Sequence, residues 1–162
     1  MAKLLNDVCD KIRPLANARR QILLVQVDSQ DAVELMGDES SLSHLFWILI
    51  DNAVKYTPPD GSIEVKLASA SGQAVVTVKD NGVGIAEADL PFIFERFFRA
   101  DPSRSQVDGS GLGLAIAKWI AEVHHSRLSA SSEFGKGTSF EIVFPHTGNL
   151  SPNVSVARAA SG

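Results

Sequence analysis

Two stretches of alternating apolar and polar residues, 62–69 (SIEVKLAS) and 73–79 (QAVVTVK), are separated by only three residues. An alternation with a period of two is typical of strands that bury one face. A short connection that contains glycine predicts that the two strands form a hairpin. A second pair, 127–132 (RLSASS) and 138–144 (TSFEIVF), repeats the pattern around the loop EFGKG. The chain is therefore expected to build a sheet around two hairpins.

Helical spacing of apolar residues predicts three longer helices around these hairpins. The first covers about 4–20 and is expected to bend near Pro14. The second begins among the N-cap candidates of GDESS at 37–41 and is stopped by Pro58. The third covers 111–124, with Leu112, Leu114 and Ile116 expected in the core. The apolar residues on one face of this helix are Leu112, Ala115, Ile116, Trp119, Ile120 and Val123.

Shorter elements complete the predicted order. Strands are expected at 22–27 and 32–36, and a short helical segment at 86–92. The order of helix, two strands, helix, hairpin, helix and hairpin predicts an α+β fold, a mixed and mostly antiparallel sheet covered on one face by helices. One domain at 1–146 is expected. The segment 147–162 has no aromatic residue, is rich in Ser, Asn, Ala and Pro, and is expected to be a disordered tail.

Composition excludes several classes of protein. The 162 residues carry a formal net charge of -4, which does not favour nucleic-acid binding. The longest apolar run, 45–50, is far short of the roughly 20 residues that cross a bilayer, so no direct membrane contact is expected. Cys9 is the single cysteine, which fits a reducing compartment and a cytoplasmic location.

Glycine-rich motifs suggest phosphate binding but fail the common fingerprints. The segments that begin at Gly82 and Gly111 both start G-x-G, but neither has glycine at its sixth position. The segment GKGT at 135–138 lacks the Ser or Thr that a P-loop requires after its lysine. Five motifs remain in a fixed order along the chain: DNAVKY, DNGVGI, FIFERFFR, GSGLGLAIAK and GKGTSFEI.

In this order the five motifs resemble the catalytic, ATP-binding domain of bacterial sensor histidine kinases, within the wider group of gyrase-type, MutL-type and Hsp90-type ATPases. The resemblance covers about 4–145 and implies a two-layer α/β sandwich of the Bergerat type. It also implies transfer of the γ-phosphoryl group of Mg-ATP to a histidine on a separate dimerisation domain. A response regulator receiver domain would act downstream.

The resemblance also implies roles for single residues. Asn52 would hold magnesium, Asp80 would bind adenine, and 94–99 with the polar run 100–109 would form a lid. Catalytic roles fall on Asn52, Lys55 and Arg99. The residues implied in nucleotide binding are Asn52, Lys55, Tyr56, Asp80, Gly82, Gly84, Ile85, Phe94, Gly109, Ser110, Gly111, Leu112, Gly113, Leu114 and Thr138.

The chemistry of Asp80 agrees with the implied role. An ionised carboxylate only accepts hydrogen bonds, and the exocyclic amine of adenine only donates them, so this residue suits adenine and would repel the carbonyl oxygen of guanine. Gly82 and Gly84 let the backbone turn tightly beside a base. The alternative is a simple turn at the end of a strand, because Asn-Gly is also a hairpin signal.

Two departures from the family pattern narrow the function. Ile48 stands where sensor kinases usually carry Asn and where ATP-hydrolysing relatives carry a Glu that activates water, and an aliphatic side chain cannot act as a general base. No histidine lies in a phosphoacceptor motif; surface or capping roles are expected for His44, His124, His125 and His146. The alternatives are an anti-sigma-type serine kinase, an ATPase, or a degenerate nucleotide-binding interaction module.

Overall fold

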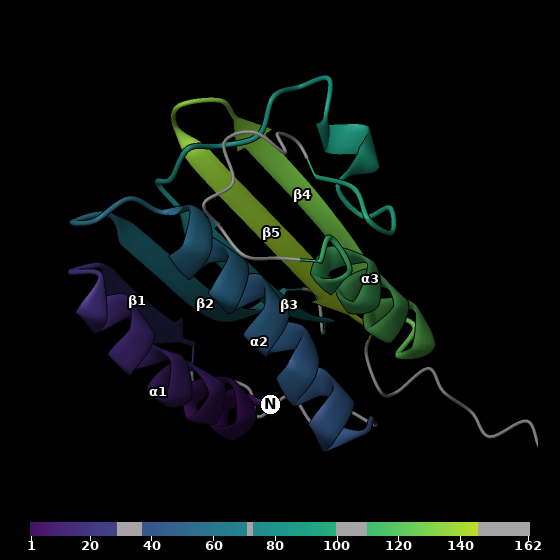
Figure 1. The fold of residues 1–162 in the computed structure, drawn as a ribbon. Coiled ribbons are helices and arrows are strands. Elements are labelled where there is room, and N and C mark those ends of the chain that lie inside the picture. The colour runs from purple at the N-terminus through teal and green to yellow at the C-terminus, as the bar shows by residue number, and fades with distance from the viewer. Residues whose placement is uncertain (29–36, 71–72, 100–109, 146–162) are drawn as a thin grey trace, which may run out of the picture.

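The computed structural model describes residues 1–28, 37–70, 73–99 and 110–145, which form one sheet and its covering helices (Figure 1). The strands are β1 (Ile22–Val27), β2 (Ser62–Ala70), β3 (Gln73–Asp80), β4 (Arg127–Glu133) and β5 (Gly137–Phe144). Their order in the sheet is β1-β2-β3-β5-β4. The pairing of β1 with β2 is parallel, and the other three pairings are antiparallel. Both predicted hairpins are confirmed.

Three helices cover one face of this sheet, as Figure 1 shows: α1 (Ala2–Ala18), α2 (Glu39–Tyr56) and α3 (Gly113–Val123). The core lies between the two layers, and its largest fully buried side chains include Phe46, Leu49, Ile63, Ile142 and Phe144. The predicted α+β sandwich is therefore confirmed. The segment around 86–92 contains only a short 3-10 helix, η1 (Leu90–Phe92). The predicted strand at 32–36, the lid at 100–109 and the tail at 147–162 lie outside the described residues.

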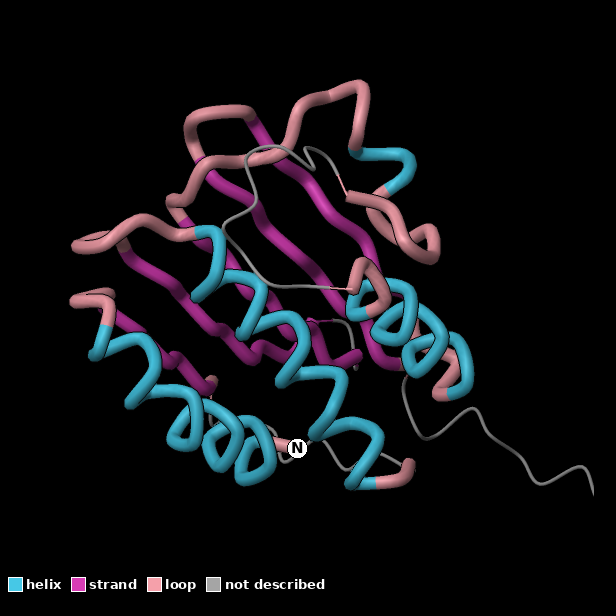
Figure 2. The backbone as a smooth tube through the Cα atoms, in the orientation of Figure 1, coloured by secondary structure: helices cyan, strands magenta, loops and turns pink. Residues whose placement is uncertain are grey.

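The topology brings distant motifs to one end of the sheet. Because β1 and β2 are parallel, α2 must return across the sheet between them, and its last turn lies where β2 begins. Asp80, the last residue of β3, pairs with Ile63 at this same end, and Gly137 begins β5 there opposite Glu133. Figure 2 shows the loops after α2 and β3 together at the upper left.

The structure corrects two expectations about packing. Ile116 was expected in the core but is 37% exposed, and Trp119 and Val123 on the same face of α3 are 60% and 55% exposed. Ile120 of the predicted face is buried, and the helix also buries Ala117 and Ala121, because α2 and β4 pack against that side. Phe97, in the predicted lid segment 94–99, is 70% exposed.

The edge of the sheet at β1 is held by α1. The amides of Ile22 and Asp28 donate to the carbonyls of Gly61 and Leu67, at the two ends of the pairing with β2. Leu23 lies between these positions, and its carbonyl accepts a hydrogen bond from Arg13 Nη1 at 3.1 Å. None of the helices in the described part of the chain has the length and hydropathy needed to cross a membrane.

Candidate functional site

Asp80 lies at the centre of the site and is only 5% exposed. Its Oδ1 accepts hydrogen bonds from the backbone amides of Gly82, at 2.8 Å, and Thr138, at 3.3 Å. Among the described residues both hydrogen bonds go to Oδ1, which leaves Oδ2 as the acceptor for a ligand. Burial raises the pKa of this carboxyl above the usual Asp range, and the two amide hydrogen bonds oppose the rise only in part. The residue is therefore a desolvated acceptor held in a fixed orientation.

Two glycines allow the backbone to close around Asp80. A Cβ at Gly82 would collide with the carbonyl oxygen of Tyr56, and one at Gly137 would collide with the carbonyl oxygen of Asp80. Gly137 also has a φ of 117°, a value that L side chains rarely adopt. Gly84 has a φ of 68° and approaches the backbone of Glu133. These contacts hold the loop after β3 against α2 and against the β4–β5 turn.

Ser132 connects this loop to β5, a role that the sequence reasoning missed. Its hydroxyl accepts a hydrogen bond from the amide of Ile85 at 2.8 Å and donates to the carbonyl of Gly137 at 2.8 Å. The hydroxyl also lies 2.9 Å from Thr138 Oγ1. Ile85 and Thr138, both predicted in the site, are therefore held by one side chain. A serine in a stretch of serines, RLSASS, carries no sequence signal that distinguishes it.

The end of α2 presents the second group of predicted residues. The amide nitrogen of Asn52 donates to the Ile48 carbonyl at 2.9 Å, so the amide oxygen is the atom that remains for a ligand. Lys55 Nζ forms an ion pair with Asp51 at 2.6 Å. Tyr56 is 48% exposed, and its carbonyl accepts from the amide of Val83, in the loop after Asp80, at 3.2 Å.

The glycine-rich start of α3 lies close to the same helix. A Cβ at Gly113 would contact Ile48 Cγ2 at 3.5 Å, one turn before Asn52 on α2. Gly111 has a φ of 70°, and its carbonyl accepts from the amide of Phe97 at 2.9 Å. The structure thus brings the third and fourth motifs together and places them beside the helix of the first.

The remaining predicted residues are placed as follows. Phe94 packs edge-on against Phe140, with ring centroids 6.4 Å apart. Leu112 and Leu114 are half-buried, and Ser110 and Arg99 are exposed at the two ends of the segment that is not described. Gly109 lies outside the described residues.

His124 and His44 lie outside this site. His124 Nδ1 lies 2.8 Å from the carbonyl of Ile120, and its Nε2 accepts from the amide of Asp38 at 3.2 Å, which confirms a capping role at the end of α3. His44 is exposed on α2.

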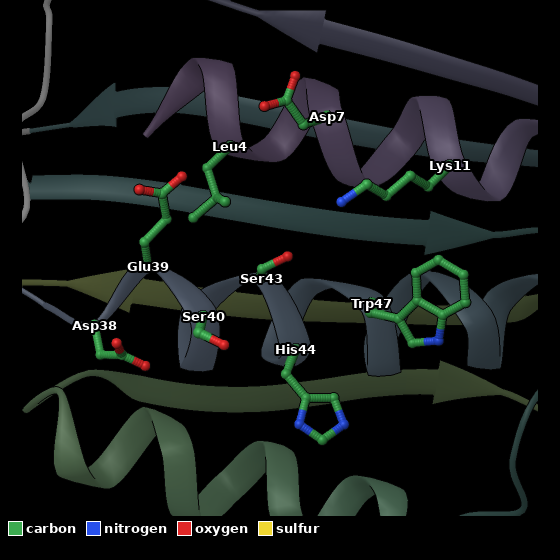
Figure 3. A pocket seen from close by; sticks show the side chains of 9 residues that line it. All are labelled: Leu4, Asp7, Lys11, Asp38, Glu39, Ser40, Ser43, His44 and Trp47. Carbon is green, nitrogen blue, oxygen red and sulfur yellow. The ribbon is translucent and has the colours of Figure 1, made fainter.

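An open groove of about 660 Å³ lies elsewhere, between the first turns of α1 and α2. Figure 3 shows its lining: Leu4, Asp7, Lys11, Asp38, Glu39, Ser40, Ser43, His44 and Trp47. None of these side chains belongs to the five motifs. Within the described ranges there is also no group of three or more His, Cys, Asp or Glu side chains that could hold a metal ion.

Comparison with known proteins agrees with this arrangement. Residues 37–148 match the family described as histidine kinase-, DNA gyrase B- and HSP90-like ATPases. The chain is 35% identical to the sensor protein SphS of Synechococcus elongatus, over 96% of this chain and 39% of SphS. It is 42% identical to the phosphate regulon sensor protein PhoR of Pseudomonas aeruginosa, over 74% of this chain and 27% of PhoR. The chain thus spans well under half the length of these relatives.

Solved structures support the same assignment. The mycobacterial sensor histidine kinase MprB superposes with a TM-score of 0.75 and 32% identity, over 86% of this chain and 94% of that one. ShkA, solved at full length in complex with AMPPNP, gives a TM-score of 0.77 and 27% identity, over 88% of this chain and 29% of ShkA. The chain belongs to the histidine kinase-, gyrase B- and HSP90-like ATPases, and within them to the catalytic domains of sensor histidine kinases.

Proposed function

We propose that this domain binds Mg-ATP and transfers the γ-phosphoryl group to a histidine on a separate dimerisation domain, in the cytoplasmic part of a two-component sensor kinase. The observation that carries the proposal is the buried carboxylate of Asp80, with one oxygen held by backbone amides and the other left as an acceptor. A response regulator would receive the phosphoryl group afterwards.

Asp80 would recognise the base. Its free oxygen accepts from the exocyclic amine of adenine, and a charged hydrogen bond of this kind contributes about 1.5–3 kcal/mol. Tyr56 extends from the end of α2 with nearly half of its surface exposed and would pack near the base. Guanine presents a carbonyl oxygen at the corresponding position, so the same carboxylate repels it.

Asn52 and Lys55 would act on the phosphates. The orientation of the Asn52 amide fits a magnesium ion, because its oxygen is the atom left for a ligand and magnesium prefers oxygen ligands. The ion would supply charge stabilisation for the transferred group. Lys55 is held by Asp51 beside Asn52 and can turn from that ion pair to a phosphate oxygen. Backbone amides at the start of α3, from Gly111 to Gly113, favour the anionic triphosphate.

Ile48 favours phosphoryl transfer over hydrolysis of ATP. The side chain is 7% exposed, packs one turn before Asn52, and has no atom that accepts a proton. Water at the site would thus not be activated by this residue, which disfavours the ATPase alternative. Transfer to an external histidine then depends on positioning and charge stabilisation.

The deciding experiment is incorporation of radiolabelled γ-phosphate into an added helical dimer that carries a phosphoacceptor histidine. We expect slow, acid-labile labelling of the dimer and no labelling of the domain itself, because the effective concentration that covalent linkage provides is absent. Asn52→Ala should abolish transfer while the melting temperature without nucleotide changes little, since Asn52 is only half-buried at the site.

Asn17→Ala provides a matched control, because it makes the same substitution at an exposed position of α1 away from the motifs. Its transfer rate should equal that of the wild type. Acid-stable label on the partner would favour the serine-kinase alternative, and transfer that survives Asn52→Ala would show that the metal ligand is assigned wrongly. Nucleotide binding without any transfer would favour the interaction module.

A further inference from the structure

The corner between α1 and β1 contacts the last turn of α2 through two polar side chains. Arg19 Nη1 donates to the carbonyls of Val54, at 2.9 Å, and Lys55, at 3.3 Å. Gln21 Nε2 donates to the carbonyls of Val54, at 3.0 Å, and Thr57, at 2.6 Å. These are carbonyls that a helix leaves without intrahelical partners at its C-terminus. The end of α2 is thus capped from another part of the chain.

The backbone of the corner is built to place these two side chains. The amides of Arg19 and Gln21 both donate to the carbonyl of Ala16, and Arg20 between them has a φ of 57°. This left-handed residue is a common way to end a helix. It sends Arg19 and Gln21 toward α2, while Arg20 forms an exposed ion pair with Asp60 at 3.0 Å. Two adjacent arginines therefore have different surroundings.

The same end of α2 also contacts the loop after β3, which follows Asp80. The next carbonyl, that of Tyr56, accepts from the amide of Val83, which follows Asp80 by three residues. The last turn of α2 also carries Lys55, and Asn52 lies one turn earlier. The contacts therefore run in sequence from Arg19, through the carbonyls of α2, to the loop that holds Asp80.

The polar character of the corner exceeds what packing alone requires. Gln21 is 3% exposed and Thr57 is 1% exposed. Gln21 Oε1 and Thr57 Oγ1 have no hydrogen-bond partner among the described residues. Because unsatisfied buried polar atoms are destabilising, an apolar contact between this corner and the end of α2 would be more stable. What the amide and guanidinium supply is a defined position for the helix end.

We propose that Arg19, with Gln21, is a positioning residue for the nucleotide site, acting through the end of α2 on the loop at Val83. The inference rests on the proposed binding of ATP. When Arg19 is removed, the last turn of α2 loses the donor shared by two of its carbonyls. The Tyr56 carbonyl in that turn is then less firmly held as the acceptor for the Val83 amide. The affinity for ATP then falls although no residue that touches the nucleotide has changed.

The test compares Arg19→Gln with Arg20→Gln by calorimetric titration with Mg-ATP. The two variants lose the same charge at neighbouring positions, but only the first loses contacts to α2. We expect Arg19→Gln to raise the dissociation constant about five- to thirty-fold, in the lower part of the range typical of coupling between sites. Arg20→Gln should leave it within about twofold, since exposed ion pairs contribute little. Arg19→Lys, which keeps one donor group, should recover part of the affinity.

Two further measurements separate positioning from general destabilisation. Ile12→Val shortens a fully buried side chain of α1 and should lower the melting temperature with no change in affinity. Hydrogen exchange of the Val83 amide in the nucleotide-free protein should accelerate in Arg19→Gln and remain unchanged in Arg20→Gln. An unchanged dissociation constant in Arg19→Gln, or an equal loss in Ile12→Val, would overturn the proposal. A wild-type domain that does not bind ATP would contradict the proposed function instead, and the Val83 exchange would still test the contact.

Discussion

Replacing Asp80 with Asn should separate nucleotide recognition from stability. The substitution keeps the shape of the side chain, and its amide oxygen can still accept from the amides of Gly82 and Thr138. The negative charge that the adenine amine would meet is lost. Since a hydrogen bond to a charged group contributes about 1.5–3 kcal/mol, ATP affinity should fall roughly 10- to 150-fold.

The same substitution should not destabilise the nucleotide-free domain. Burial raises the pKa of Asp80, which means that the ionised form is disfavoured in the folded state relative to the unfolded state. A neutral amide avoids this penalty. The melting temperature of Asp80→Asn without nucleotide should therefore equal or exceed that of the wild type at neutral pH.

Isothermal titration calorimetry with ATP and GTP, combined with thermal unfolding, tests both statements. Asp60→Asn is the matched control: Asp60 is exposed, pairs with Arg20, and has a φ of 67° that Asn adopts readily. Its affinity for ATP should be unchanged. The role of Asp80 is refuted if Asp80→Asn binds ATP as tightly as the wild type, if the wild type binds GTP equally well, or if Asp80→Asn melts well below the wild type.

Three other predictions concern Asp80 and the backbone around it. At pH values between the usual Asp pKa and the raised pKa of Asp80, the folded state binds more protons than the unfolded state. The free energy of unfolding should therefore fall as the pH rises through this window. Asp80→Asn should lack this dependence. In binding titrations, by contrast, the affinity for ATP should fall as the pH is lowered, because acid protonates Asp80. Gly137→Ala should lower the free energy of unfolding by about 2 kcal/mol or more and weaken ATP binding, because its Cβ meets the Asp80 carbonyl. Gly135→Ala is the control, because Gly135 also has a positive φ, 83°, but no atom lies within 4 Å of its added Cβ. Urea titrations in which both variants lose equal stability would contradict the clash at Gly137.

Short-range patterns in the sequence predict much of this fold. Alternation gives the two hairpins, and the position of Asp80 at the end of a strand follows directly from it. Only the family resemblance predicts the grouping of the motifs, because the pairing of β3 with β5 joins residues 60–70 positions apart. Loop closure over such lengths leaves no local trace in the residues.

The contacts that the sequence could not predict are those between polar side chains and distant backbone. Arg19 and Ser132 bind carbonyls or amides 35–47 positions away, and any backbone group could have been the partner. The exposure of Trp119 was missed for a related reason. An apolar stripe shows that a helix has an apolar face, but neighbouring elements decide which residues that face buries.

The hydrogen bond from Arg13 to the Leu23 carbonyl bears on self-association. The outer strand β1 carries exposed side chains at Ile22 and Leu24, and an apolar strand with open backbone groups can recruit a strand from another molecule. The guanidinium occupies one of these acceptors and places a positive charge along the side of β1 that no other described strand covers. A second copy that approached β1 would have to displace Arg13 and desolvate its charge before the first interstrand hydrogen bond could form, so the contact that seats α1 on the sheet also keeps neighbouring molecules from extending it.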